Sequence, residues 1–62
     1  MTIIQRLRAL KTHTGTWARL ASAFGVTPAA LFRWLSGDRE VRGPALKLLE
    51  IYERNPELML TD

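Results

Sequence analysis

The chain has 62 residues with a formal charge of +3 and a calculated pI near 10.2, and it contains no cysteine and a single histidine, His13. This length suits one small domain, which buries only about 60% of its unfolded surface, and the composition excludes disulfides, thiolate metal sites and a histidine metal cluster. Because no apolar run approaches the roughly 20 residues of a membrane span and no signal-peptide pattern begins the sequence, we expect a cytoplasmic protein with no metal and no cofactor.

The first predicted element is a helix from about Thr2 to Lys11. Its apolar residues recur at helical spacing and form one inward stripe: Ile3, Ile4, Leu7 and Leu10. The polar residues between them are expected to face water: Gln5, Arg6, Arg8 and Lys11. The segment 12–16 is too polar and too rich in turn formers to continue the helix, so His13 is expected in an exposed loop. Thr16 is expected to cap the next helix.

Two further helices are predicted on either side of a short turn. The first runs from Trp17 to Phe24, and Gly25 after it supplies the permissive backbone that a helix C-terminus needs. Thr27 can cap the second helix, and Pro28 fits its first turn, where a missing N–H costs nothing. Gly37 ends the second helix. Because the turn is tight, the two helices are expected to cross steeply, as they do in a helix-turn-helix.

One face of each of these helices is apolar. The residues expected to point inward are Leu20, Ala21, Phe24, Val26, Leu31 and Trp34. The second helix leaves four residues pointing outward: Pro28, Ala29, Phe32 and Arg33. Ala21 has a physical reason to be small, because it is expected where the helices cross closely and a larger side chain would push them apart.

A last helix is predicted from Pro44 to Arg54, and Asn55-Pro56 ends it. Its inward stripe is Ala45, Leu48, Leu49 and Tyr52. Five apolar residues lie outside this stripe or in the tail: Leu46, Ile51, Leu58, Met59 and Leu60. A chain this small should struggle to cover them, so we expect them to form a homodimer interface, with residues 54–62 as a dimerisation tail. The alternative is that the tail folds back as a short fifth helix and completes the core, and the two are compatible.

The stretch from Thr16 to Ser36 resembles the helix-turn-helix of phage Cro and repressor-type (XRE-like) DNA-binding domains. The matching residues are Leu20 and Ala21, Gly25 four residues after Ala21, Val26 after the glycine, Leu31, and the ending Arg33-Trp34-x-x-Gly37. The following segment VRGPALKLLE resembles the next helix of many small members, so the likeness covers most of residues 16–51. It implies an all-α fold, a four- or five-helix bundle containing a helix-turn-helix.

The resemblance also implies which residues meet DNA. Contacts to bases in the major groove would come from Thr27, Pro28, Ala29, Phe32 and Arg33. Contacts to the DNA backbone would come from Thr16, Trp17, Ser36, Arg39 and Arg42. In the free protein Asp38 and Glu40 would pair with the two loop arginines, but such exposed pairs yield easily to phosphate.

Two positions depart from the family pattern, which has polar residues there. The indole N–H of Trp17 can donate to a phosphate, or its ring packs against the first or the last helix. Phe32 can contact a thymine methyl, as can Ala29, or it leans back over Val41 or a neighbouring loop. This apolar surface favours readout of DNA shape and methyl groups over readout by hydrogen bonds.

The charge distribution agrees with a polyanionic partner. Residues 1–42 carry seven Lys/Arg against two acids, a balance of +5, and residues 43–62 carry two against four, a balance of −2. We therefore expect a sequence-specific DNA-binding transcriptional regulator, a small dimeric Cro-like repressor or autorepressor on a two-fold operator. The alternative is an antitoxin-type or other protein-interaction module whose C-terminal surface binds a partner protein. No nucleophile–base set and no paired carboxylates occur, so an enzyme is not expected.

Overall fold

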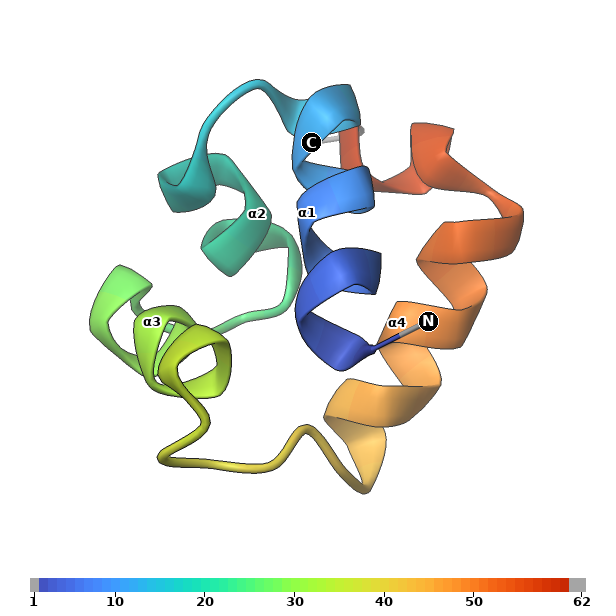
Figure 1. The fold of residues 1–62 in the computed structure, drawn as a ribbon. Coiled ribbons are helices and arrows are strands. Elements are labelled where there is room, and N and C mark those ends of the chain that lie inside the picture. Colours follow the sequence, from blue (N-terminus) through green and yellow to red (C-terminus); the bar gives the residue numbers. More distant parts are fainter. Residues whose placement is uncertain (1, 61–62) are drawn as a thin grey trace.

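The computed structural model describes residues 2–60, which form an all-helical fold (Figure 1). The elements are α1 (Ile3–Thr14), α2 (Trp17–Ala23), α3 (Pro28–Ser36), α4 (Pro44–Arg54) and a 3₁₀ helix, η1 (Pro56–Leu60). This confirms the predicted all-α class. None of the helices in this part of the chain is long and apolar enough to cross a membrane.

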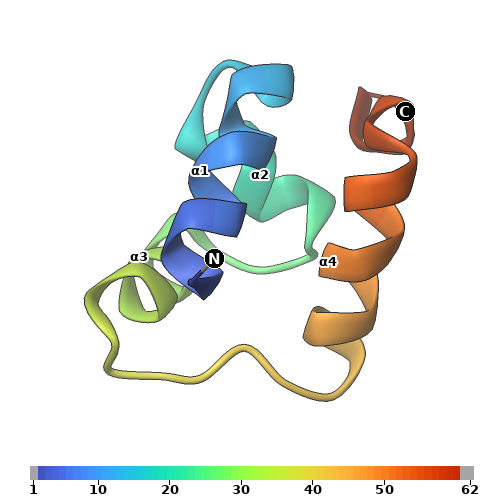
Figure 2. The same cartoon turned by 45° about the vertical axis from the view of Figure 1, so that its right-hand side comes forward.

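Helix α1 lies at the centre of the fold and packs against α2, α3, α4 and η1 (Figures 1 and 2). Helices α2 and α3 lie on one side of it and α4 lies on the other. The segment 37–43 runs from the end of α3 to the start of α4, and η1 returns toward the C-terminal end of α1. Helices α2 and α3, with the turn between them, therefore pack together against one side of α1.

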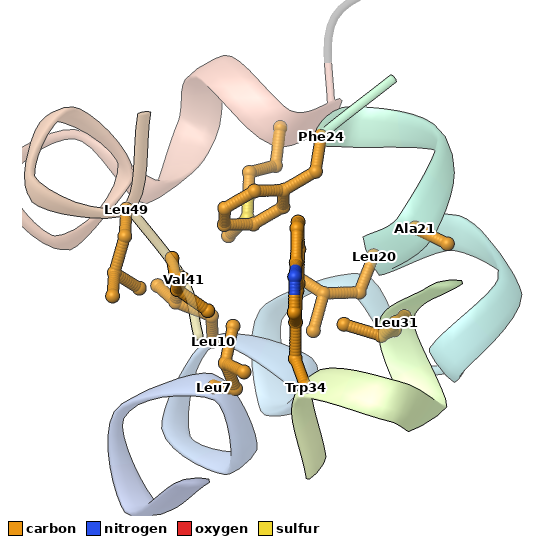
Figure 3. Packing of buried hydrophobic residues seen from close by; sticks show 10 residues of the cluster. Leu7, Leu10, Leu20, Ala21, Phe24, Leu31, Trp34, Val41 and Leu49 are labelled. Carbon is orange, nitrogen blue, oxygen red and sulfur yellow. The ribbon is translucent and has the colours of Figure 1, made fainter. Parts of the chain in front are cut away.

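Each α-helix contributes one fully buried leucine to the core: Leu7, Leu20, Leu31 and Leu49. All four are residues that the helical periodicity predicts to point inward. Figure 3 shows the side chains of this cluster, with the ring of Trp34 beside Leu20 and Leu31. Burying a leucine in full stabilises a fold by about 1.5–3 kcal/mol, so these four contribute much of the stability of so small a chain.

A row of three aromatic rings joins α2, α3 and α4. Phe24 lies edge-on to Trp34, with 5.8 Å between ring centroids, and edge-on to Tyr52, with 5.4 Å. The hydroxyl of Tyr52 also donates a hydrogen bond to the carbonyl of Ala23, 2.6 Å away. That carbonyl belongs to the last turn of α2, where helix carbonyls have no partner within the helix. The row thus fixes the end of α2 against α4.

Helix α1 continues to Thr14, three residues beyond the predicted end at Lys11. The prediction that residues 12–14 belong to a loop is wrong, because threonine hydroxyls can satisfy carbonyls of the last helical turn. The hydroxyl of Thr12 donates to the carbonyl of Ala9 at 2.6 Å, and the buried Thr14 hydroxyl lies 3.2 Å from the carbonyl of Lys11. Gly15, at φ 89°, then ends the helix. His13 is exposed, as expected, but on the helix.

The helical pattern predicted that Arg6 faces water. In the structure, Arg6 pairs with Glu53 of α4. Its Nε donates to Oε2 at 2.9 Å and its Nη2 donates to Oε1 at 2.6 Å, a two-pronged contact. The side chains remain 25% and 32% exposed. The hydrogen bond from Arg6 holds the pKa of Glu53 below its ordinary value, and the same bond raises the pKa of Arg6.

We expect this pair to make stability depend on pH. The pKa of Glu53 is lower in the folded chain than in the unfolded one. The contribution of this pair to the free energy of unfolding is therefore complete above the ordinary pKa of 4.5 and is lost as the pH falls through the lowered pKa. Both side chains stay in contact with water, so the loss is about 1 kcal/mol or less. Urea unfolding at pH 7 and pH 3 measures it. Glu53→Gln should flatten the pH dependence more than Glu57→Gln, and equal curves for both variants would contradict the assignment.

The tail folds back onto the bundle, as the alternative interpretation held, although as a 3₁₀ helix. Met59, one of the predicted interface residues, is 9% exposed and belongs to the core of the single chain. Leu46 is partly buried against the same core. Three of the five predicted interface residues are exposed: Ile51 (38%), Leu58 (45%) and Leu60 (58%). Residues 61 and 62 of the predicted tail lie outside the described part of the chain.

Candidate nucleic-acid interface

The turn between α2 and α3 is closed by backbone hydrogen bonds. The N–H of Gly25 donates to the carbonyl of Ser22 and the N–H of Val26 donates to the carbonyl of Ala21, both at 3.0 Å. This pair of bonds is a Schellman motif, and it requires the left-handed backbone that Gly25 adopts at φ 72°. Ala21 is completely buried, in agreement with its predicted place at a close helix crossing. We call residues Trp17 to Ser36 the α2–turn–α3 unit.

Helix α3 starts and ends where the sequence predicts. The hydroxyl of Thr27 accepts from the N–H of Ala30 at 3.2 Å, and Pro28 occupies the first turn. Gly37 ends the helix in a left-handed conformation at φ 86°. Thr27 keeps its own hydroxyl proton for another acceptor, because the cap uses only its oxygen.

The five predicted base-contacting residues of the unit are all exposed: Thr27, Pro28, Ala29, Phe32 and Arg33. We call this set the α3 outer face. Leu31 and Trp34, on the opposite side of the helix, are buried. Phe32 is 49% exposed and is not among the side chains that pack against the core, whereas Val41 is buried there. The side of α3 directed away from the bundle is therefore largely apolar.

Of the predicted backbone-contacting residues, Ser36 is the least available. Its hydroxyl donates to the carbonyl of Arg33 at 3.1 Å, so its single proton already has a partner. The hydroxyl of Thr16 differs, because it accepts from the N–H of Arg19 at 3.1 Å and keeps its proton. Thr16 is exposed at the start of α2, where a phosphate can reach it.

Trp17 packs in the way that the second of its two interpretations describes. It is partly buried against the core, and the Nζ of Lys11 lies 5.1 Å from the centroid of its ring. A cation at this distance from an indole face is attracted to it. The contact holds Lys11 beside the start of α2, and sequence reasoning did not select Lys11 as a DNA contact. The sequence of α1 alone does not indicate the contact between Lys11 and Trp17, because this contact depends on how α2 is oriented after the turn at Gly15.

The loop after α3 is folded back onto the end of that helix. The N–H of Arg39 donates to the carbonyl of Arg33 at 3.2 Å, and Val41 is anchored in the core. Arg39 and Arg42 are exposed. Arg42 lies 3.9 Å from Glu40, with both side chains at least 80% exposed, so this pair adds little to stability and yields to a stronger anion. The loop thus presents two exposed arginines between the end of α3 and the start of α4.

Within residues 2–60 the acidic side chains are confined to the loop after α3 and to α4 and η1, where Lys47 and Arg54 accompany the glutamates of α4. No acidic residue occurs before Asp38 in the sequence, so α1, α2 and α3 carry cations alone. Three glutamates lie on α4 and η1: Glu50, Glu53 and Glu57. The first turn of α3 holds no acidic side chain, so the partial positive charge of its N-terminus is not offset there. The α2–turn–α3 unit therefore suits a polyanion.

Two hollows lie outside the α3 outer face. One, of about 780 Å³, is lined by residues of α2, α4 and η1, including Arg19, Tyr52 and Leu60. The other, of about 390 Å³, lies between the start of α1 and the loop after α3. Within residues 2–60, no group of three His, Asp or Glu side chains is placed to hold a metal ion. Comparisons of the chain with protein-family models, curated proteins and solved structures gave no match.

Proposed function

We propose that this protein binds double-stranded DNA through the α2–turn–α3 unit, used as a helix-turn-helix, and regulates transcription as a small sequence-specific repressor. The observation that carries the proposal is the α3 outer face, which includes Arg33 and is exposed along one side of a short helix. Arg39 and Arg42 are exposed in the loop that follows, and α1, α2 and α3 carry no acidic residue. Such a protein acts in the cytoplasm without catalysis, and its concentration and operator affinity set its occupancy.

The dimensions of α3 support this proposal. An α-helix with its side chains is about 10–12 Å across, and the major groove of B-DNA is about 12 Å wide. With α3 in the groove, its first turns approach the base edges. The hydroxyl of Thr16, at the start of α2, and Arg39 and Arg42, in the loop, then serve the phosphates on either side. This arrangement divides the exposed residues into base-facing and backbone-facing sets.

A homodimer is part of the proposal. A single module of this size makes a small interface with DNA, and linking two modules strengthens binding greatly. Ile51, Leu58 and Leu60 are exposed large hydrophobics on α4 and η1, away from α3. A second copy seated there would leave both α3 helices free. The same surface favours the alternative function, an antitoxin-type module, if a different protein occupies it.

Arg33→Ala tests the placement of α3. Arg33 is the only cation on α3, so its loss should weaken binding to a duplex selected from a random pool by about 5- to 150-fold and relax specificity at one base pair per half-site. Fluorescence anisotropy with the selected duplex and its single-base variants measures both effects. Arg54→Ala, in the last turn of α4, is the matched control and should bind as the wild type does. Unchanged binding by Arg33→Ala would show that α3 does not face DNA.

A further inference from the structure

Phe32 stands apart from the other exposed hydrophobic residues. Four large hydrophobics are exposed in residues 2–60, and three of them lie on α4 and η1. Phe32 alone lies on α3, with 49% of its surface exposed and with Pro28 and Ala29 exposed about one turn earlier. The fold does not use this ring, because the core side of α3 is formed by Leu31 and Trp34. The exposed half of the ring is therefore available to an external partner.

The surroundings of Phe32 define that partner as an anion with an apolar centre. Arg33 is its neighbour in the sequence, and the backbone bond between Arg39 and Arg33 keeps a second arginine close to the end of α3. Hydrogen-bonding groups are scarce on this face, which has no Asn or Gln. The hydroxyl of Thr27 keeps its proton to donate, and the hydroxyl of Ser36, at the end of α3, already donates to the carbonyl of Arg33. The partner must therefore offer negative charge at its edges and a nonpolar group between them.

In the major groove of DNA, the nonpolar group between the phosphates is the C5-methyl of thymine. Cytosine lacks this methyl, and 5-methylcytosine carries it at the same ring position. We propose that Phe32, with Ala29, reads pyrimidine C5-methyl groups, so that binding depends on them and a 5-methylcytosine can serve where a thymine methyl does. This inference rests on the proposed function, and it extends it to a protein whose binding responds to cytosine methylation.

The test exchanges single methyl groups in the duplex. Replacing each thymine of a selected duplex in turn by deoxyuridine removes one methyl and leaves base pairing unchanged. At one or two positions per half-site, each single exchange should weaken wild-type binding roughly three- to fivefold, as expected for one buried carbon. At a cytosine that replaces such a thymine, 5-methylcytosine should bind more tightly than cytosine by a similar factor.

Phe32→Ala assigns the effect to the ring. This variant should bind the thymine and deoxyuridine duplexes equally, and Phe32→Leu should keep part of the difference. Arg54→Ala is the control, because it removes an exposed side chain of α4 outside both the α3 outer face and the proposed dimer surface and should leave the thymine-to-deoxyuridine ratio unchanged. Circular dichroism checks that each variant is folded, which is expected since Phe32 lies outside the core.

The outcomes separate this inference from the proposed function. If wild-type protein binds duplex DNA but shows no thymine-to-deoxyuridine difference at any position, the methyl inference is wrong and DNA binding stands. If the difference persists in Phe32→Ala, another residue reads the methyl and the assignment to Phe32 is wrong. If no duplex is bound at all, the proposed function fails, and the α3 outer face belongs to a protein contact.

Discussion

Raising the salt concentration from 50 to 200 mM should weaken DNA binding by about a hundred- to a thousandfold per protein chain. Of the seven cations in residues 1–42, Arg6 is held by Glu53, which leaves six that can interact with DNA: Arg8, Lys11, Arg19, Arg33, Arg39 and Arg42. If about four to six phosphates are neutralised, the plot of log affinity against log salt has a slope of roughly −4 to −5, and about twice that for a dimer. A salt titration by fluorescence anisotropy measures the slope.

Single variants refine this measurement. Arg39→Ala and Arg42→Ala should each reduce the slope by about one and weaken binding to all sequences alike, because phosphate contacts carry no base information. Lys47→Ala removes a cation from α4, on the other side of α1, and should leave the slope unchanged. A slope near zero for the wild type would rule out binding through the basic side of the bundle.

Replacing Leu58 and Leu60 together by serine should give a folded monomer that binds a full operator at least about a hundredfold more weakly than the wild type. Two helix-turn-helix modules place their recognition helices in successive major grooves, about 34 Å apart. A dimer therefore binds a two-fold operator with higher affinity than a monomer does. The two leucines are 45% and 58% exposed, so replacing them should destabilise the monomer less than replacing a core residue. Binding to an isolated half-site should be unchanged.

Sedimentation and circular dichroism on the same sample distinguish the outcomes. Met59→Ser is the contrasting variant, because Met59 is buried and its loss should unfold the chain rather than separate two copies. A double variant that remains dimeric would place the interface elsewhere. A wild type that is monomeric at all concentrations and co-purifies with a different protein would favour the antitoxin-type function.

Most of the fold could be predicted because its signals are local. Helix α3 has a threonine cap, a proline in its first turn and a glycine at its end, and the bounds of α3 and α4 agree with the prediction. The buried leucines follow from helical spacing for the same reason. The pair Arg6–Glu53 could not be predicted, because its members are 47 residues apart and meet only when α1 and α4 pack. The burial of Met59 likewise depends on where the tail returns.

The candidate site divides in the same way. Which side of α3 faces outward follows from the positions of Leu31 and Trp34 in the helical pattern. The contact of Lys11 with Trp17 and the bond of Ser36 to Arg33 depend on side-chain rotamers and on the path of the chain between helices. Sequence spacing does not specify rotamers or the path of the chain between helices, so neither contact could be predicted from it.

The aromatic row of Trp34, Phe24 and Tyr52 has a consequence for how two copies could share one operator. Edge-on rings and the bond from Tyr52 to Ala23 tie the end of α2 to α4, so α3 has little freedom to swing relative to α4. In a dimer joined through α4 and η1, this row would hold α3 at a fixed position relative to the interface. It would thereby set the distance between the two α3 helices. The number of base pairs separating the half-sites would then be determined inside each protomer, by residues that never touch DNA.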